Sequence, residues 1–91
     1  MNIKQMISSK GNFIANQFII NDNEGYEYFQ SYRSIIVKRT KYDAGIKTEL
    51  DEKYWNCSRT TSKYRSMFLN ESTKETKEKI ASGEYILTNL N

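Results

Sequence analysis

The 91-residue sequence contains no histidine, no proline and a single cysteine. Without histidine, the chain lacks the side chain that most often serves as a general base or as a metal ligand near neutral pH. With Cys57 alone, neither an intrachain disulfide nor a thiolate metal cluster can form. We therefore expect a protein that is not an enzyme and that uses no metal or other cofactor.

Long apolar runs are also missing. The longest are Phe18-Ile19-Ile20 and Ile35-Ile36-Val37, which are far shorter than a membrane span or the apolar part of a signal peptide. We therefore expect a cytoplasmic protein with no membrane contact.

The apolar fraction is low, at 37%, but seven tyrosines, four phenylalanines and one tryptophan offset it, since aromatic side chains bury large areas. The length is typical of one domain near the lower limit for independent folding. We expect a single domain over residues 1–91, in which residues 1–11 form a loosely packed segment. A thin aromatic core is compatible with either a monomer or a homodimer.

Positive charge is concentrated in the middle third of the chain. Residues 30–65 carry nine basic and four acidic side chains, whereas the segments on either side each carry one more acidic than basic group. A local basic excess of this kind favours an anionic partner. The nine basic residues are Arg33, Lys38, Arg39, Lys41, Lys47, Lys53, Arg59, Lys63 and Arg65.

The first half of the chain is typical of a β-meander. Residues 12–21, 26–31, 34–40 and 46–50 each show strand-like alternation or β-branched residues. Asn-, Asp- and Gly-rich segments that favour turns lie at residues 21–25 and 42–45. Ile3, Met6 and Ile7 have helical spacing over a stretch too short to define a helix.

Two helices and a last strand follow. Ser58, Thr60 and Thr61 are candidate N-caps, and Tyr64, Met67 and Phe68 have the spacing of a buried helical stripe that ends near Asn70. Ser72 and Glu75 predict a capping box, and Gly83 predicts a left-handed C-terminus. Glu71–Lys74 and Glu75–Lys79 have the spacing of helical ion pairs. With residues 84–90 as a closing strand, the order is ββββααβ: an α+β fold with an antiparallel sheet of four to five strands and two short helices.

Three groups of side chains are candidate contacts for a partner. Residues 58–65 place hydroxyls and cations at a helix start, where free amides favour an anion; the structural alternative is an N-cap with solvated charges. Lys38, Arg39 and Lys41 beside Tyr42 suit single-stranded nucleic acid, although lysines on strands also protect sheet edges.

Tyr26, Tyr28 and Tyr32 fit either a binding face or one side of a thin core. Cys57 is expected to be a small buried residue beside Trp55.

Several segments together resemble a family of short bacteriophage and mobile-element proteins. The resemblance covers roughly residues 26–91, and Cys57 departs from the aromatic residue expected at its position. It implies a biological setting, the cytoplasm of a bacterial host cell, but no assigned chemistry. The segments that carry it are residues 28–36, Leu50-Asp51, Tyr54-Trp55, residues 58–65, Phe68-Leu69, Glu75-Thr76 and residues 83–85.

Similarity of setting to anti-defence proteins, anti-CRISPR proteins among them, leads to the functional expectation. The protein would bind and inhibit a host-defence protein or nucleoprotein such as a CRISPR-Cas effector, in stoichiometric amounts. The alternatives are a small basic nucleic-acid-binding accessory protein and an assembly factor of a phage particle. The expected contact residues are Tyr32, Arg33, Lys38, Arg39, Tyr42, Arg59, Lys63 and Arg65.

Overall fold

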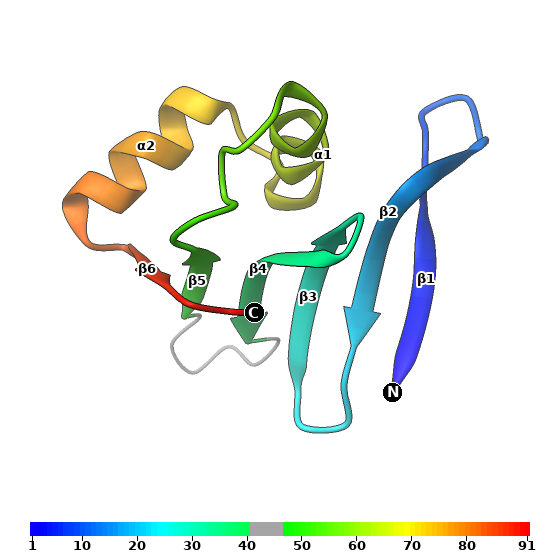
Figure 1. Ribbon diagram of the computed structural model, residues 1–91, viewed down its shortest axis with the longest axis horizontal. Coiled ribbons are helices and arrows are strands. Elements are labelled where there is room, and N and C mark those ends of the chain that lie inside the picture. Colours follow the sequence, from blue (N-terminus) through cyan, green and yellow to red (C-terminus); the bar gives the residue numbers. More distant parts are fainter. Residues whose placement is uncertain (41–46) are drawn as a thin grey trace.

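The computed structural model describes residues 1–40 and 47–91 as one six-stranded sheet with two helices (Figure 1). The α+β class predicted from the sequence is confirmed, with one strand more than expected. The elements are β1 (Asn2–Ile7), β2 (Phe13–Asn21), β3 (Tyr26–Ser31), β4 (Ser34–Thr40), β5 (Thr48–Asp51), α1 (Arg59–Leu69), α2 (Thr73–Ser82) and β6 (Tyr85–Thr88).

The strands lie in the sheet in the order in which they occur along the chain. Each pair of neighbouring strands from β1 to β5 is antiparallel, whereas β5 and β6 are parallel to each other. The sheet is therefore mixed and not wholly antiparallel, because α1 and α2 carry the chain back to the starting end of β5 before β6 begins. The additional strand is β1, within residues 1–11, and its Met6 reaches the core.

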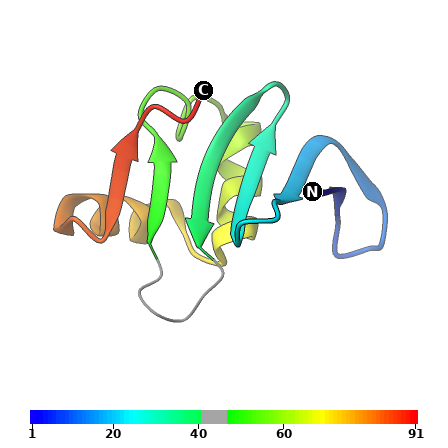
Figure 2. The ribbon, with the colours of Figure 1, turned by 90° about the horizontal axis from the view of Figure 1, so that it is seen from below.

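Each strand sends alternate side chains to two different faces of the sheet. Phe29, Val37 and Leu50 lie side by side in register and are fully buried. Both described helices lie on this covered face (Figure 2). The neighbouring row, in which Tyr28, Lys38 and Glu49 pair across β3 to β5, points to the opposite, open face.

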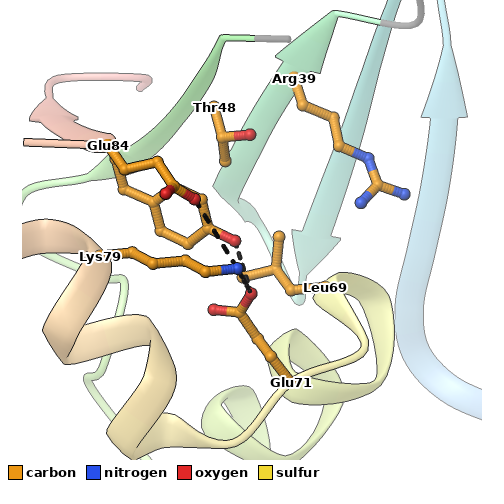
Figure 3. Close-up of a pocket in the computed structure, with 7 residues that line it drawn as sticks. Arg39, Thr48, Leu69, Glu71, Lys79 and Glu84 are labelled. Carbon is orange, nitrogen blue, oxygen red and sulfur yellow. Dashed lines mark hydrogen bonds and ion pairs between the residues drawn. The ribbon is translucent and has the colours of Figure 1, made fainter.

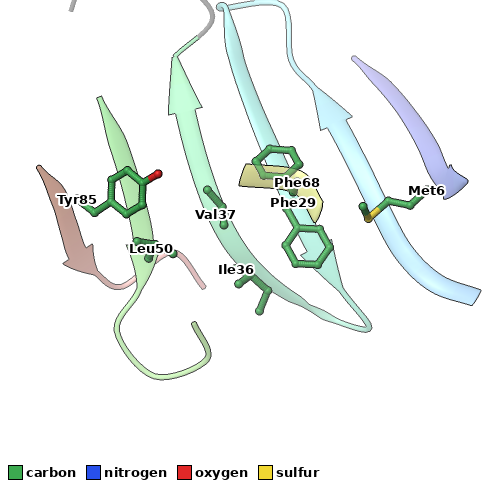
Figure 4. Close-up of a cluster of buried hydrophobic side chains, with 7 residues drawn as sticks. All are labelled: Met6, Phe29, Ile36, Val37, Leu50, Phe68 and Tyr85. Atoms are coloured by element: carbon green, nitrogen blue, oxygen red, sulfur yellow. The ribbon is translucent and has the colours of Figure 1, made fainter. Parts of the chain in front are cut away.

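The core lies between the covered face and the helices, and Figure 4 shows its buried hydrophobic side chains. The ring of Phe68 from α1 stacks on Phe29 with centroids 5.7 Å apart, a pairing worth about 0.5–1.5 kcal/mol beyond burial. Tyr54, Trp55 and Ile80 pack against its margin. The buried hydrophobic residues are Met6, Phe29, Ile36, Val37, Leu50, Phe68 and Tyr85.

Helix α1 begins and ends where the sequence indicates, but it buries a different stripe. Ser58 caps its start by accepting from the Thr61 amide at 3.1 Å, and Asn70 ends it in the left-handed conformation. Its buried residues are Thr61, Arg65 and Phe68, whereas Met67 is 43% exposed. The apolar periodicity predicted the wrong stripe because two of the three residues that are actually buried, Thr61 and Arg65, are polar.

Helix α2 follows the sequence prediction closely. The capping box between Ser72 and Glu75 is complete, and Gly83 ends the helix with a φ of 85°. A left-handed residue at this position is most readily a glycine.

The buried Asp51 carboxylate joins the end of β5 to two other segments. It accepts hydrogen bonds from the amides of Lys53 and Tyr54 in the loop before α1 and from the Leu90 amide near the C-terminus. Cys57, expected to be buried, is exposed in that loop, and it is Trp55 from the same loop that packs against the core. Among the described residues, neither helix is long and apolar enough to span a membrane.

Candidate interaction surfaces

The eight predicted contact residues do not form one patch. Tyr32 and Arg33 form the turn between β3 and β4, Arg59 and Lys63 lie on α1, and Lys38 and Arg39 lie on β4. Arg65 is buried. Tyr42 and Lys41 lie outside the described residues.

The turn at Tyr32 is held in an unfavourable backbone conformation. Tyr32 has a φ of 57°, which costs a residue with a Cβ about 1–2 kcal/mol, and glycine or asparagine usually occupies such positions in a two-residue hairpin turn. Its amide donates to the Asn16 carbonyl, and its carbonyl accepts from Gln30 Nε2, both at 2.7 Å. These bonds hold the backbone of a tyrosine whose side chain is exposed; the residue is 52% exposed.

The first turn of α1 lies beside this hairpin turn. The hydroxyls of Ser31 and Thr61 are 3.1 Å apart and buried. Because successive helical residues turn by about 100°, Arg59 and Lys63 lie on the side of α1 that faces away from the sheet, and both are exposed. We use the name turn surface for four exposed residues at this end of the molecule: Tyr32 and Arg33 in the hairpin turn, and Arg59 and Lys63 on the outer side of α1.

Lys38 and Arg39 are separated by the sheet itself. On the open face, Lys38 Nζ lies 4.3 Å from the centre of the Tyr26 ring. On the covered face, the Arg39 guanidinium pairs with Glu27 at 2.7 Å and stacks on the Phe68 ring at 4.1 Å. Neighbouring strand residues point to opposite faces, so these two cations cannot meet the same flat surface.

Arg65 serves the interior instead of a surface. Its guanidinium donates to the Trp55 carbonyl, to Asn56 Oδ1 at 3.2 Å and to Thr73 Oγ1 at 2.7 Å. Burial lowers the pKa of Arg65, and the nearby Glu71 charge opposes that shift. A side chain committed in this way cannot also contact a partner.

The open face gathers aromatic and aliphatic side chains. Tyr26 and Tyr28 on β3 lie there, half-buried among their neighbours, and outside the core beneath the helices. Tyr28 donates to the Asp22 carboxylate at 3.1 Å. Hydrogen bonding by the Tyr26 amide is the main reason that the pKa of Asp22 is lowered. Acidic and basic groups therefore share this face.

A polar pocket of about 320 Å³ lies between α2 and the covered face (Figure 3). Glu71 Oε1 accepts from Lys79 at 2.8 Å and from the Tyr85 hydroxyl at 2.6 Å, while its Oε2 accepts from Thr76. Glu71 thus pairs with Lys79 and not with Lys74. The Arg39 side chain on the pocket wall turns away from this cluster, as Figure 3 shows.

Titration of the pocket groups follows from these contacts. Burial raises the pKa of Glu71, but hydrogen bonds from Lys79, Thr76 and Tyr85 outweigh it and the net pKa is lowered. Burial, with the bond to Glu71, raises the pKa of Tyr85 to about 12. The groups are thus held in their neutral-pH forms and neutralise one another, which is typical of a structural cluster. No local sequence pattern predicts this cluster, because Glu71 and Tyr85 are fourteen positions apart.

In the described part of the chain, no group of three or more His, Cys, Asp or Glu side chains could hold a metal ion. The chain belongs to DUF8033, a family of unknown function, whose family model matches residues 1–84. The match begins at the first residue and so includes the segment that the bacteriophage-type resemblance covers least. Comparison with curated proteins and with solved structures gives no match.

Proposed function

We propose that the protein is a non-enzymatic inhibitor that binds a bacterial defence nucleoprotein, such as a CRISPR-Cas effector, and covers one of its working surfaces. The turn surface makes the contact, with Tyr32 as its aromatic anchor. The biological setting rests on the resemblance to bacteriophage and mobile-element proteins.

The observation that carries this proposal is the conformation of Tyr32. An exposed tyrosine with a positive φ costs folding energy that glycine would avoid. Strained residues of this kind concentrate at functional sites. Tyrosine and arginine are also the residues most often found as binding hot spots, and Tyr32 is followed directly by the exposed Arg33.

The charges of the turn surface support the same type of partner. Arg33, Arg59 and Lys63 are all exposed, and none of them forms an ion pair among the described residues. A nucleoprotein offers both protein surface for the tyrosine and phosphate groups for the cations. Lys38, Arg39 and Arg65 are not part of this contact.

The test is a titration of purified guide-loaded effectors with the protein, read out as target-DNA cleavage. We expect cleavage to fall linearly and to end at about one equivalent, because an inhibitor that covers a surface is consumed by its target. Tyr32→Gly should raise the required concentration at least tenfold, while its folded stability equals or exceeds that of the wild type. Loss of binding without loss of stability separates the contact role of Tyr32 from a folding role.

Charge reversal supplies the matched comparison. Arg33→Glu should weaken inhibition strongly, whereas Lys77→Glu, the same charge change on the exposed side of α2, should have no effect. The proposal fails if no effector retains the protein, if Tyr32→Gly inhibits as well as the wild type, or if far less than one equivalent suffices.

A nucleic-acid-binding accessory protein is the second candidate, favoured by Tyr26, Tyr28 and Lys38 on the open face. Aromatic rings beside a lysine on a sheet can stack single-stranded bases. Asp22 and Glu49 on the same face repel phosphates, so we rank it lower. The test is a gel shift with single-stranded nucleic acid at two salt concentrations. If the protein has this function, binding weakens as the salt concentration rises, and Tyr28→Leu abolishes it.

A further inference from the structure

Strand β1 forms an edge of the sheet (Figure 1, right). Within residues 1–40 and 47–91, β2 is its one pairing partner. Ile3 is 59%, Ile7 54% and Phe13 72% exposed. Single exposed apolar residues are ordinary, but these three lie on two neighbouring strands at the same edge.

The exposed residues also share one face. Ile3 pairs with Ile20, and Ile7 pairs with Phe13 across β1 and β2. Met6 points into the core, so the alternation of the strand directs Ile3, Gln5 and Ile7 to the open face. An apolar strip therefore follows the outer strand.

The strand is unusually well suited to further pairing. Gln5 pairs with Phe18 and Ile7 pairs with Phe13. Two steps along β1 therefore correspond to five steps along β2, so the extra residues lie in β2 and β1 remains extended. Edge strands are commonly protected by proline, by several charges or by a bulge. β1 has no proline and one charged side chain, Lys4.

We propose that β1 pairs with β1 of a second copy of this chain, antiparallel about a two-fold axis at Gln5. This inference does not depend on the proposed function. In this register Ile3 lies opposite Ile7 of the second copy, and Lys4 lies opposite Met6. A two-fold axis at Lys4 would instead place two ammonium groups against each other, which is destabilising.

The pairing accounts for the exposed apolar side chains. It forms a row on the open face from Ile20 and Ile3 of one copy to Ile7 and Phe13 of the other, and symmetry repeats this row on the other side of the axis. The contact is isologous, as expected of a two-fold dimer. It also satisfies the free backbone groups of β1 and joins the two sheets into one.

The first test uses sedimentation velocity on the full chain over a range of concentrations. We expect a dimer in the wild type, a monomer in Ile3→Lys/Ile7→Lys and a dimer in Ile3→Glu/Ile7→Lys. Both double variants add two charges to the same edge, but only the first opposes like charges in the proposed register. Circular dichroism confirms that both variants remain folded.

Disulfide trapping checks the register directly. In a Cys57→Ser background, Gln5→Cys should form a covalent dimer on oxidation, because residues directly opposite have Cβ atoms about 4.5–5.5 Å apart. Lys4→Cys should not, because its counterpart lies diagonally, at about 7–8 Å.

The proposal is overturned by a wild type that stays monomeric up to its solubility limit, which would leave the edge for a strand of a different protein. Dimerisation of both double variants would also overturn it, because the contact would then lie elsewhere. If neither double variant dimerises, the proposed register is rejected.

Discussion

Arg65 is a fully buried cation whose partners are neutral oxygens. In the described structure its guanidinium donates to the Trp55 carbonyl, to Asn56 and to Thr73, and it lies 5.2 Å from the Trp55 ring. The planar group connects the loop before α1 with the first residue of α2. Geometry of this kind distinguishes arginine from lysine.

We expect Arg65→Lys to lower the free energy of unfolding by about 2 kcal/mol, because one ammonium group cannot reach all three acceptors and buried polar atoms lose their partners. Urea unfolding measures the change. The control is Arg59→Lys on the exposed side of the same helix, for which we expect a change within about 0.5 kcal/mol. Equal effects of the two substitutions would contradict the structural role of Arg65.

At the level of the elements, the helices owe much to side chains at their ends. Helix α2, in which half of the residues are charged, has one buried residue, Thr76. Its start is stabilised by two reciprocal bonds: the Glu75 amide donates to Ser72 Oγ at 3.1 Å, and the Ser72 amide donates to Glu75 Oε1 at 3.2 Å. With so little apolar burial, the capping box carries a large share of the stability of this helix.

Ser72→Ala should therefore lower the free energy of unfolding by about 1 kcal/mol, since it removes the side-chain acceptor of the N-cap. Ser9→Ala, an exposed serine in the loop between β1 and β2, is the comparison and should be neutral. Amide hydrogen exchange should locate the effect in residues 73–76. Uniform loss of protection over the sheet, with none specific to α2, would refute this explanation.

At the scale of the whole molecule, two buried carboxylates connect segments that are distant in sequence. Asp51 holds the loop before α1 and the Leu90 amide, and Glu71 holds α2 and β6. Burial raises the pKa of Asp51, but hydrogen bonds from the amides of Leu90 and Tyr54 outweigh it and the net pKa is lowered. Both groups thus have folded-state pKa values below their ordinary values of 3.8 and 4.5.

Carboxylates with lowered pKa values stabilise the folded state above their unfolded pKa values and lose this contribution as the pH falls through the folded values. We expect the free energy of unfolding to be level between about pH 5 and 8 and to fall steeply below pH 4. Asp51→Asn should be much less stable than the wild type at pH 7, and the difference should shrink on acidification. Glu52→Gln, the exposed neighbour, should follow the wild type throughout; a pH-independent difference for Asp51→Asn would refute the assignment.

Local sequence patterns were sufficient to predict the elements whose structure depends on contacts between residues close in sequence. The β-branched run of β4, the capping box of α2 and the left-handed Asn70 and Gly83 depend on contacts within a few residues, so the α+β order could be predicted. Strand β1 was not predicted, because its six residues form a strand only by pairing with β2.

Charge count alone indicated a basic middle region, but it could not tell which cations remain free. Lys38 and Arg39 are adjacent in sequence and lie on opposite faces of the sheet, and Arg65 is enclosed by oxygens from three other residues. Tyr32 was already a candidate contact from the sequence, but its exposure and its positive φ are visible only in the structure. Composition and periodicity therefore determined the elements that depend on local contacts. The edge strand β1, the burial of each residue and the side-chain partners arise when distant segments pack, and only the tertiary structure decided them.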